Sequence, residues 1–105
     1  MRKASVPFKE SLVERLKQHP EAQFEYLKAM LEENHDMPEI ILGALRDVAE
    51  ARGFEKLAAD AGLSQKALYK ILKKEDAHPR FETIVQIFDA LGVKLTLAPI
   101  KKKAV

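Results

Sequence analysis

The sequence contains no cysteine and no long apolar run in its 105 residues. Without cysteine the chain cannot form a disulfide, use a thiolate nucleophile or bind zinc through thiolates. No stretch of about 18 consecutive apolar residues is present, so the sequence predicts no membrane-spanning helix. The basic N-terminus lacks the continuous apolar region of a secretory signal peptide. Together these absences favour a cytoplasmic protein.

Composition indicates a soluble globular chain of one domain's length. Apolar residues make up 47% of the sequence and charged residues 32%, with a formal net charge of +2. Such a small net charge predicts little, but local basic patches attract phosphate whatever the total. The lysines gather at 66–74 and 101–103, whereas most acidic residues lie between Glu10 and Glu50.

Apolar residues recur at helical spacing through most of the chain, which predicts an all-α fold. A possible capping box, Asp36 with Glu39, precedes the third helix, and Pro38 suits its first turn. The expected helices span about residues 8–18, 20–33, 37–52, 54–61, 65–73 and 81–91.

The segment after the last expected helix reads as a short strand. Val93, Leu95 and Leu97 alternate with Lys94 and Thr96, which is the period of a strand with one buried face. A lone strand leaves its backbone groups unpaired, so it needs a partner. A second copy of the chain is the simplest one, and we therefore expect a homodimer.

The stretch LAADAGLSQKALYKILKK, residues 57–74, has the pattern of two helices joined by a tight turn. Small Ala58 allows close helix packing, Gly62 permits a left-handed backbone, and Ser64 is a strong N-cap. On a helical wheel the second helix buries Leu68, Ile71 and Leu72. Its other face holds Gln65, Lys66, Tyr69, Lys70 and Lys73, with no carboxylate.

That polar face suits nucleic acid. Gln65 can bond adenine through two hydrogen bonds, and Lys66 can meet guanine acceptors or phosphate. Tyr69 can bond phosphate or pack on a thymine methyl group. The alternative is an ordinary helical hairpin with a solvated lysine face, which is common in proteins.

Residues 46–97 resemble the Cro/repressor-type (XRE) helix-turn-helix domain, and more narrowly the HigA-type addiction module antidotes. The resemblance rests on VAEARG, LAADAGLS, ALYKIL, PRFETI and ALGVKL, in this order. It implies a lambda-repressor-like helical bundle, with N-terminal helices in residues 1–36 and a DNA-binding domain in residues 37–105. Glu55 and Lys56 depart from the serine and glutamine that many relatives carry there.

The resemblance also implies a function. Such proteins form dimers, bind palindromic operators in double-stranded DNA, repress their own operon and neutralise a co-encoded toxin, often of the RelE/HigB type. The base-reading positions carry over to Gln65, Lys66 and Tyr69. The expected contacts to the DNA backbone are Lys56, Ser64, Lys70, Lys73, Lys74 and Arg80.

No other pattern in the chain predicts chemistry. His19, His35 and His78 are not spaced as metal ligands on one helix face. No catalytic triad pattern, phosphate-binding glycine loop or HExxH motif is present, so we expect neither enzyme activity nor a cofactor. Phe24, Tyr26 and Met30 could line a partner groove, although core packing is the simpler interpretation.

Two alternatives to an operon-linked antitoxin stay open. The protein could be a stand-alone, phage-like repressor without a toxin. It could also be a protein-interaction module whose helix-turn-helix no longer binds DNA. The lysines at 101–103 could contact the DNA backbone or simply form a mobile tail.

Overall fold

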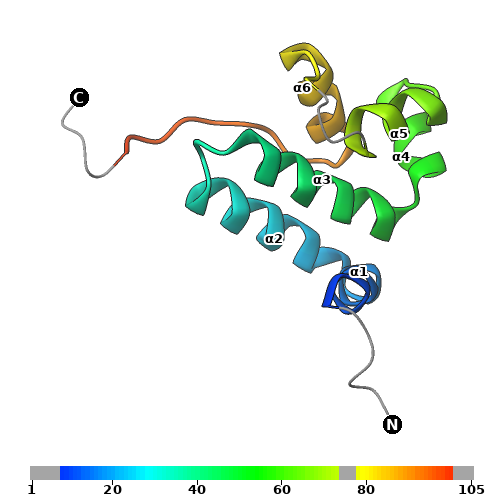
Figure 1. Ribbon diagram of the computed structural model, residues 1–105, viewed down its shortest axis with the longest axis horizontal. Coiled ribbons are helices and arrows are strands. Elements are labelled where there is room, and N and C mark those ends of the chain that lie inside the picture. The colour runs from blue at the N-terminus through cyan, green and yellow to red at the C-terminus, as the bar shows by residue number, and fades with distance from the viewer. Residues whose placement is uncertain (1–7, 74–77, 101–105) are drawn as a thin grey trace, which may run out of the picture.

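The computed structural model describes residues 8–73 and 78–100 (Figure 1). Within these residues the only regular secondary structure is α-helix, which confirms the predicted all-helical class. The helix bounds agree closely with the sequence expectation. They are α1 Phe8–Gln18, α2 Pro20–Glu33, α3 Pro38–Arg52, α4 Phe54–Ala61, α5 Gln65–Lys73 and α6 Phe81–Ala90.

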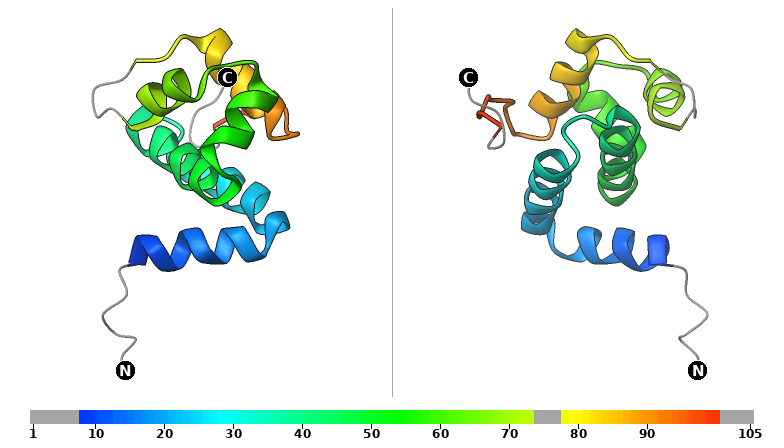
Figure 2. Two further views of the ribbon diagram at one scale, coloured as in Figure 1. Left: turned by 90° about the vertical axis from the view of Figure 1, so that its right-hand side faces the viewer. Right: turned by 60° about the vertical axis from the view of Figure 1, so that its left-hand side comes forward.

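Helix α3 lies at the centre of the fold. The first two helices pack on one side of it, and α4 and α5 contact it from the other, with α6 against α4 (Figures 1 and 2). Every helix contributes to one apolar core, from Leu16 of α1 to Phe88 of α6. The proposed division near residue 36 therefore separates segments that share a core, and it stays a prediction.

The core is built from the apolar stripe of each helix. Leu45, Val48, Leu57, Leu68 and Ile87 are each fully buried. Burying a leucine or isoleucine side chain contributes about 1.5–3 kcal/mol each. Leu68 and Leu72, which periodicity assigned to the interior of α5, are thus among the side chains that hold the helices together.

Proline begins two helices, but the predicted capping box is wrong. Pro20 and Pro38 each occupy the first turn of a helix, where a missing backbone N–H costs nothing. The N-cap residue of α3 is Met37, and no side chain caps that helix. Asp36 lies one residue too early, because Pro38 fixes the start of the helix.

The predicted C-terminal strand is also wrong. Residues 93–100 form an extended segment without regular structure, leading away from the end of α6 (Figure 1). Val93 packs against the core, but Leu95 is 37% exposed and Leu97 is 97% exposed. A strand requires a neighbouring strand for its backbone groups, and the described part of this chain has none to offer.

Candidate nucleic-acid interface

Helices α4 and α5 are joined by a three-residue turn that the sequence fixes at each position. Gly62 has φ 72° and ψ 29°, the left-handed conformation that L side chains disfavour. The N–H groups of Gly62 and Leu63 donate to the carbonyls of Ala59 and Ala58, which closes the end of α4. The Ser64 hydroxyl then accepts from the backbone N–H of Ala67 at 3.0 Å, which caps α5.

Helix α5 is anchored on its inner face and at its end. Leu68 and Leu72 are fully buried, with exposed fractions of 0% and 1%. Arg46 of α3 donates to the carbonyl oxygen of Leu72 at 3.0 Å, and this satisfies one of the free acceptors at the end of α5. On α6, Gln86 similarly donates to the Ala61 carbonyl at the end of α4. The turn and the helix after it are therefore held rigidly from both sides.

The outer face of α5 is exposed and cationic. Gln65, Lys66, Tyr69 and Lys70 are all exposed, as the helical wheel predicted. The helix sequence QKALYKILK contains no carboxylate. Within the described residues, Lys66 and Lys70 make no ion pair. The outer face therefore presents one amide, one aromatic hydroxyl group and two ammonium groups to solvent.

The remaining lysine of this helix behaves differently. Lys73 forms an ion pair with Glu50 of α3. Its ammonium nitrogen also lies 5.4 Å from the ring centre of Tyr69 and 5.8 Å from that of Phe54. The two rings are 5.3 Å apart, tilted by 55°. Lys73 is therefore engaged within the protein, where the sequence predicted a phosphate contact.

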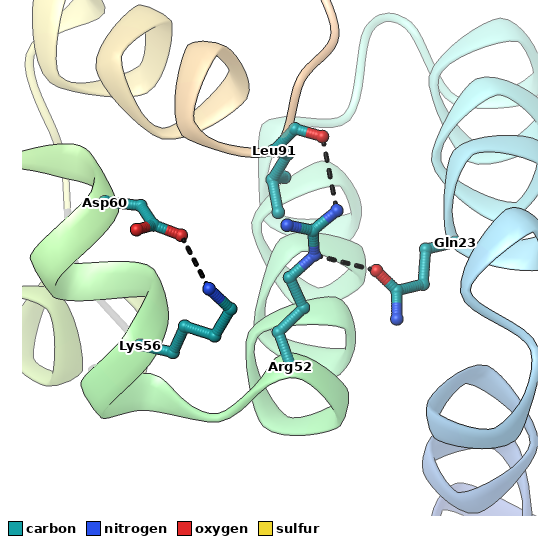
Figure 3. A network of polar contacts seen from close by, with 5 residues as sticks. All are labelled: Gln23, Arg52, Lys56, Asp60 and Leu91. Carbon is teal, nitrogen blue, oxygen red and sulfur yellow. Dashed lines mark hydrogen bonds and ion pairs between the residues drawn. The ribbon is translucent and has the colours of Figure 1, made fainter.

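The other predicted contacts to the DNA backbone come from several parts of the chain. Lys56 forms an exposed ion pair with Asp60, one turn along α4, at 3.4 Å (Figure 3). Surface pairs of this kind contribute little and exchange readily with solvent ions. Arg80 is exposed and stands directly before α6. Lys74 and the lysines at 101–103 lie outside the described residues.

A buried polar network on the opposite side of α3 was not predicted. Gln23 of α2 is only 6% exposed, and its amide donates to the carbonyl of Leu16. Arg52 donates to the Gln23 side-chain oxygen at 2.9 Å and to the Leu91 carbonyl at 3.3 Å (Figure 3). A glutamine on a helix rich in polar residues gives no sequence signal that it is buried.

Tyr26 and Met30 are partly buried, in keeping with the simpler interpretation as packing residues. Both pack against the buried cluster, and the Tyr26 hydroxyl donates to Asp47 at 2.7 Å. Burial, and then the bond to the Asp47 carboxylate, raises the pKa of Tyr26 well above its ordinary value. Phe24 differs, since it is 48% exposed.

Other kinds of site find no support in the described chain. No group of three or more potential metal ligands occurs among residues 8–73 and 78–100. The three histidines are all exposed. None of the helices that the structure describes is long and apolar enough to cross a membrane.

In the part that the structure describes, these features define a small helical domain whose helix α5 is anchored in the core and presents a cationic face. The profile of the family described as "Probable addiction module antidote protein" matches residues 9–99. The chain belongs to this family. It is similar to an uncharacterised protein of Haemophilus influenzae, with 41% identity over 69 residues, which cover 66% of this chain and 68% of that protein. No solved structure gives a significant match.

Family membership confirms the antidote part of the resemblance and indicates a cognate toxin as partner. The finer assignments, to the HigA type and to the Cro/repressor class, stay predictions. So do the roles of the individual residues on α5.

Proposed function

We propose that this protein is the antitoxin of a toxin–antitoxin operon and represses that operon by binding its promoter. In this proposal the protein acts by binding alone, without catalysis or a cofactor. Two copies would place their α5 helices in successive major grooves, about 34 Å apart, on a palindromic operator.

The outer face of α5 is the observation that carries the DNA-binding part. A short helix follows a fixed turn, its inner face is locked into the core, and its outer face presents Gln65, Lys66 and Tyr69. A helix that reads a major groove needs this combination of rigid placement and exposed hydrogen-bonding groups. The capped start of α5 and the absence of carboxylates from this helix together favour DNA binding over an ordinary solvated lysine face.

Roles follow from side-chain chemistry. Gln65, at the N-terminal end of α5, would bond an adenine edge, and Lys66 a guanine edge. Lys56, Ser64, Lys70, Lys74 and Arg80 would meet phosphates around that groove. Because each such contact releases condensed counterions, binding would weaken steeply as the salt concentration rises.

The antitoxin role in this proposal rests on family membership, and it implies a toxin as the partner. Its cognate toxin would be encoded beside it, and the resemblance to HigA-type proteins favours a RelE/HigB-type toxin. In this proposal the protein is a homodimer, and its interface includes the apolar side chains of Leu95 and Leu97, which are exposed to solvent in the single chain. Sedimentation of the full chain and of a chain truncated after Gly92 would test this interface.

A gel shift tests the DNA-binding proposal. The probe is a duplex carrying the promoter of the protein's own gene, and the competitor is a scrambled duplex of equal length. We expect binding that resists the scrambled competitor and weakens with salt. Equal binding to both duplexes contradicts sequence-specific repression, and binding to neither duplex favours a protein-interaction module.

Capture of the neighbouring gene product tests the antitoxin part separately. Co-expression of the chain with the product of the adjacent open reading frame should give a stable complex and relieve growth inhibition. A chain that binds its promoter but has no toxic neighbour would instead be a stand-alone repressor.

A further inference from the structure

Lys73 is partly buried, whereas the other two lysines of α5 are exposed. Its side chain is 30% exposed, and the Glu50 side chain with which it pairs is 24% exposed. Lys66 and Lys70, on the same helix, are exposed and have no ion pair within the described residues. The formal charge of Lys73 is therefore already compensated before any DNA arrives.

Four side chains from three helices meet at this point. Glu50 comes from α3, Phe54 begins α4, and Tyr69 and Lys73 lie one turn apart on α5. The Lys73 ammonium group contacts both aromatic rings as well as the Glu50 carboxylate. Since the charged group attracts the electron-rich face of each ring, it holds the two rings together.

We propose that Lys73 is a positioning residue for Tyr69 and that the Glu50–Lys73–Phe54 cluster sets how Tyr69 meets a base. The proposal rests on the DNA-binding function above and assigns the specificity of the same face. Tyr69 is 53% exposed, so part of its ring is covered by the cluster and the rest is open to a groove. An aromatic side chain that is held in one orientation contacts one base edge, whereas a free one samples many.

A positioning role of Lys73 and a direct contact to phosphate predict different effects on the salt dependence of DNA binding. A lysine that neutralises a phosphate contributes about 0.9 to the slope of log affinity against log salt. A lysine that is already paired with Glu50 releases few condensed counterions from the DNA, because the carboxylate still compensates its charge. Lys73 should therefore affect the discrimination between sequences and leave the salt slope unchanged.

Matched variants on one helix separate the two roles. Lys73→Met removes the charge and keeps most of the stem, and Lys70→Met makes the same change at an exposed, unpaired position. Both are measured on the promoter duplex and on a scrambled duplex over a series of salt concentrations. Lys73→Arg, which can keep the ion pair and the ring contacts, is the rescue variant.

We expect Lys73→Met to lower the ratio of specific to scrambled affinity by about tenfold, the size of one base contact. Its salt slope should match that of the wild type, and Lys73→Arg should restore the ratio. Lys70→Met should reduce the slope by about 1 and lower affinity for both duplexes alike. The proposal is overturned if Lys73→Met reduces the slope as Lys70→Met does and leaves the ratio intact.

A measurement without DNA distinguishes failure of this inference from failure of the proposed function. Ring-proton NMR shifts of Tyr69 in the free protein report its packing against Phe54, and Phe54→Leu shows the shifts of the ring without that contact. Lys73→Met and Glu50→Gln should move the Tyr69 shifts toward those of Phe54→Leu. Unmoved shifts overturn the positioning role even if the protein binds its promoter. Moved shifts in a protein that binds no duplex overturn the proposed function, and the specificity role with it.

Discussion

Arg52 of α3 donates from Nε to the side-chain oxygen of Gln23 on α2, at 2.9 Å (Figure 3). The same arginine reaches the Leu91 carbonyl at the end of α6, and Gln23 reaches the carbonyl of Leu16 on α1. Two side chains thus connect the N-terminal helices with the end of the last helix. These hydrogen bonds therefore connect α1 and α2 with α3 and with the end of α6.

Replacing Gln23 should destabilise the whole fold. Gln23→Ala leaves the buried Leu16 carbonyl and the partly buried Arg52 Nε group without their partner, at a cost of about 1–3 kcal/mol. Chemical denaturation measures the change. Gln18→Ala is the control, because its amide bonds Glu14 on an exposed face of α1 and its loss should cost less than about 0.5 kcal/mol. Equal effects of the two changes would show that the buried network stabilises the fold no more than the exposed Gln18–Glu14 hydrogen bond does.

Replacing each of two glycines with alanine should change the stability of the protein in opposite directions. Gly62→Ala forces a side chain into the left-handed turn, φ 72°, and should cost about 1–2 kcal/mol. Gly43 lies within α3, where an added methyl group would meet only the end of the Arg46 side chain at 3.5 Å. Gly43→Ala should therefore stabilise the protein by about 0.5–1 kcal/mol. Thermal unfolding of the two variants beside the wild type tests the pair, and a stabilising Gly62→Ala would contradict the turn geometry.

The turn shows how far the sequence could predict this molecule. Gly62, Ser64 and the buried leucines of α5 were predictable because helix caps and apolar periodicity are local properties. The pairing of Lys73 with Glu50 was not, since it depends on how α3 and α5 cross, and a helical wheel places Lys73 among the exposed lysines.

The predictions that the structure contradicts failed for physical reasons. The alternation of Val93, Leu95 and Leu97 has the period of a strand, but periodicity cannot supply the neighbouring strand that hydrogen bonding requires. Asp36 and Glu39 have capping-box spacing, yet Pro38 fixes the helix start beyond Asp36. Gln23 carried no signal, because its burial depends on tertiary packing alone.

Tyr26 should make the protein less stable at high pH. Burial, followed by the bond to Asp47, raises the pKa of Tyr26 in the folded state. Above pH of about 10 the unfolded chain loses the tyrosine proton while the folded chain keeps it. The unfolded state then binds fewer protons, so the free energy of unfolding falls as pH rises.

Denaturation of the wild type and of Tyr26→Phe between pH 8 and pH of about 11 tests this dependence. At pH 8 the Tyr26→Phe variant should be less stable than the wild type by about 1 kcal/mol, because it lacks the hydrogen bond to Asp47. The gap between the two proteins should narrow above pH of about 10. Lysines also titrate in this range, but they do so in both proteins and cancel in the difference. A gap that widens with pH would contradict the raised pKa.

Gln65 should determine base preference at one operator position. Its amide lies on the exposed face at the start of α5, where a recognition helix meets base edges. Gln65→Ala should weaken operator binding by about 1–3 kcal/mol and equalise the affinities for the four base pairs at a single position. Competition among duplexes carrying each single base change measures this, with Gln18→Ala, an exposed amide on α1, as the matched control. Uniform weakening at every position would instead make Gln65 a contact to the DNA backbone, because a phosphate bond carries no base information.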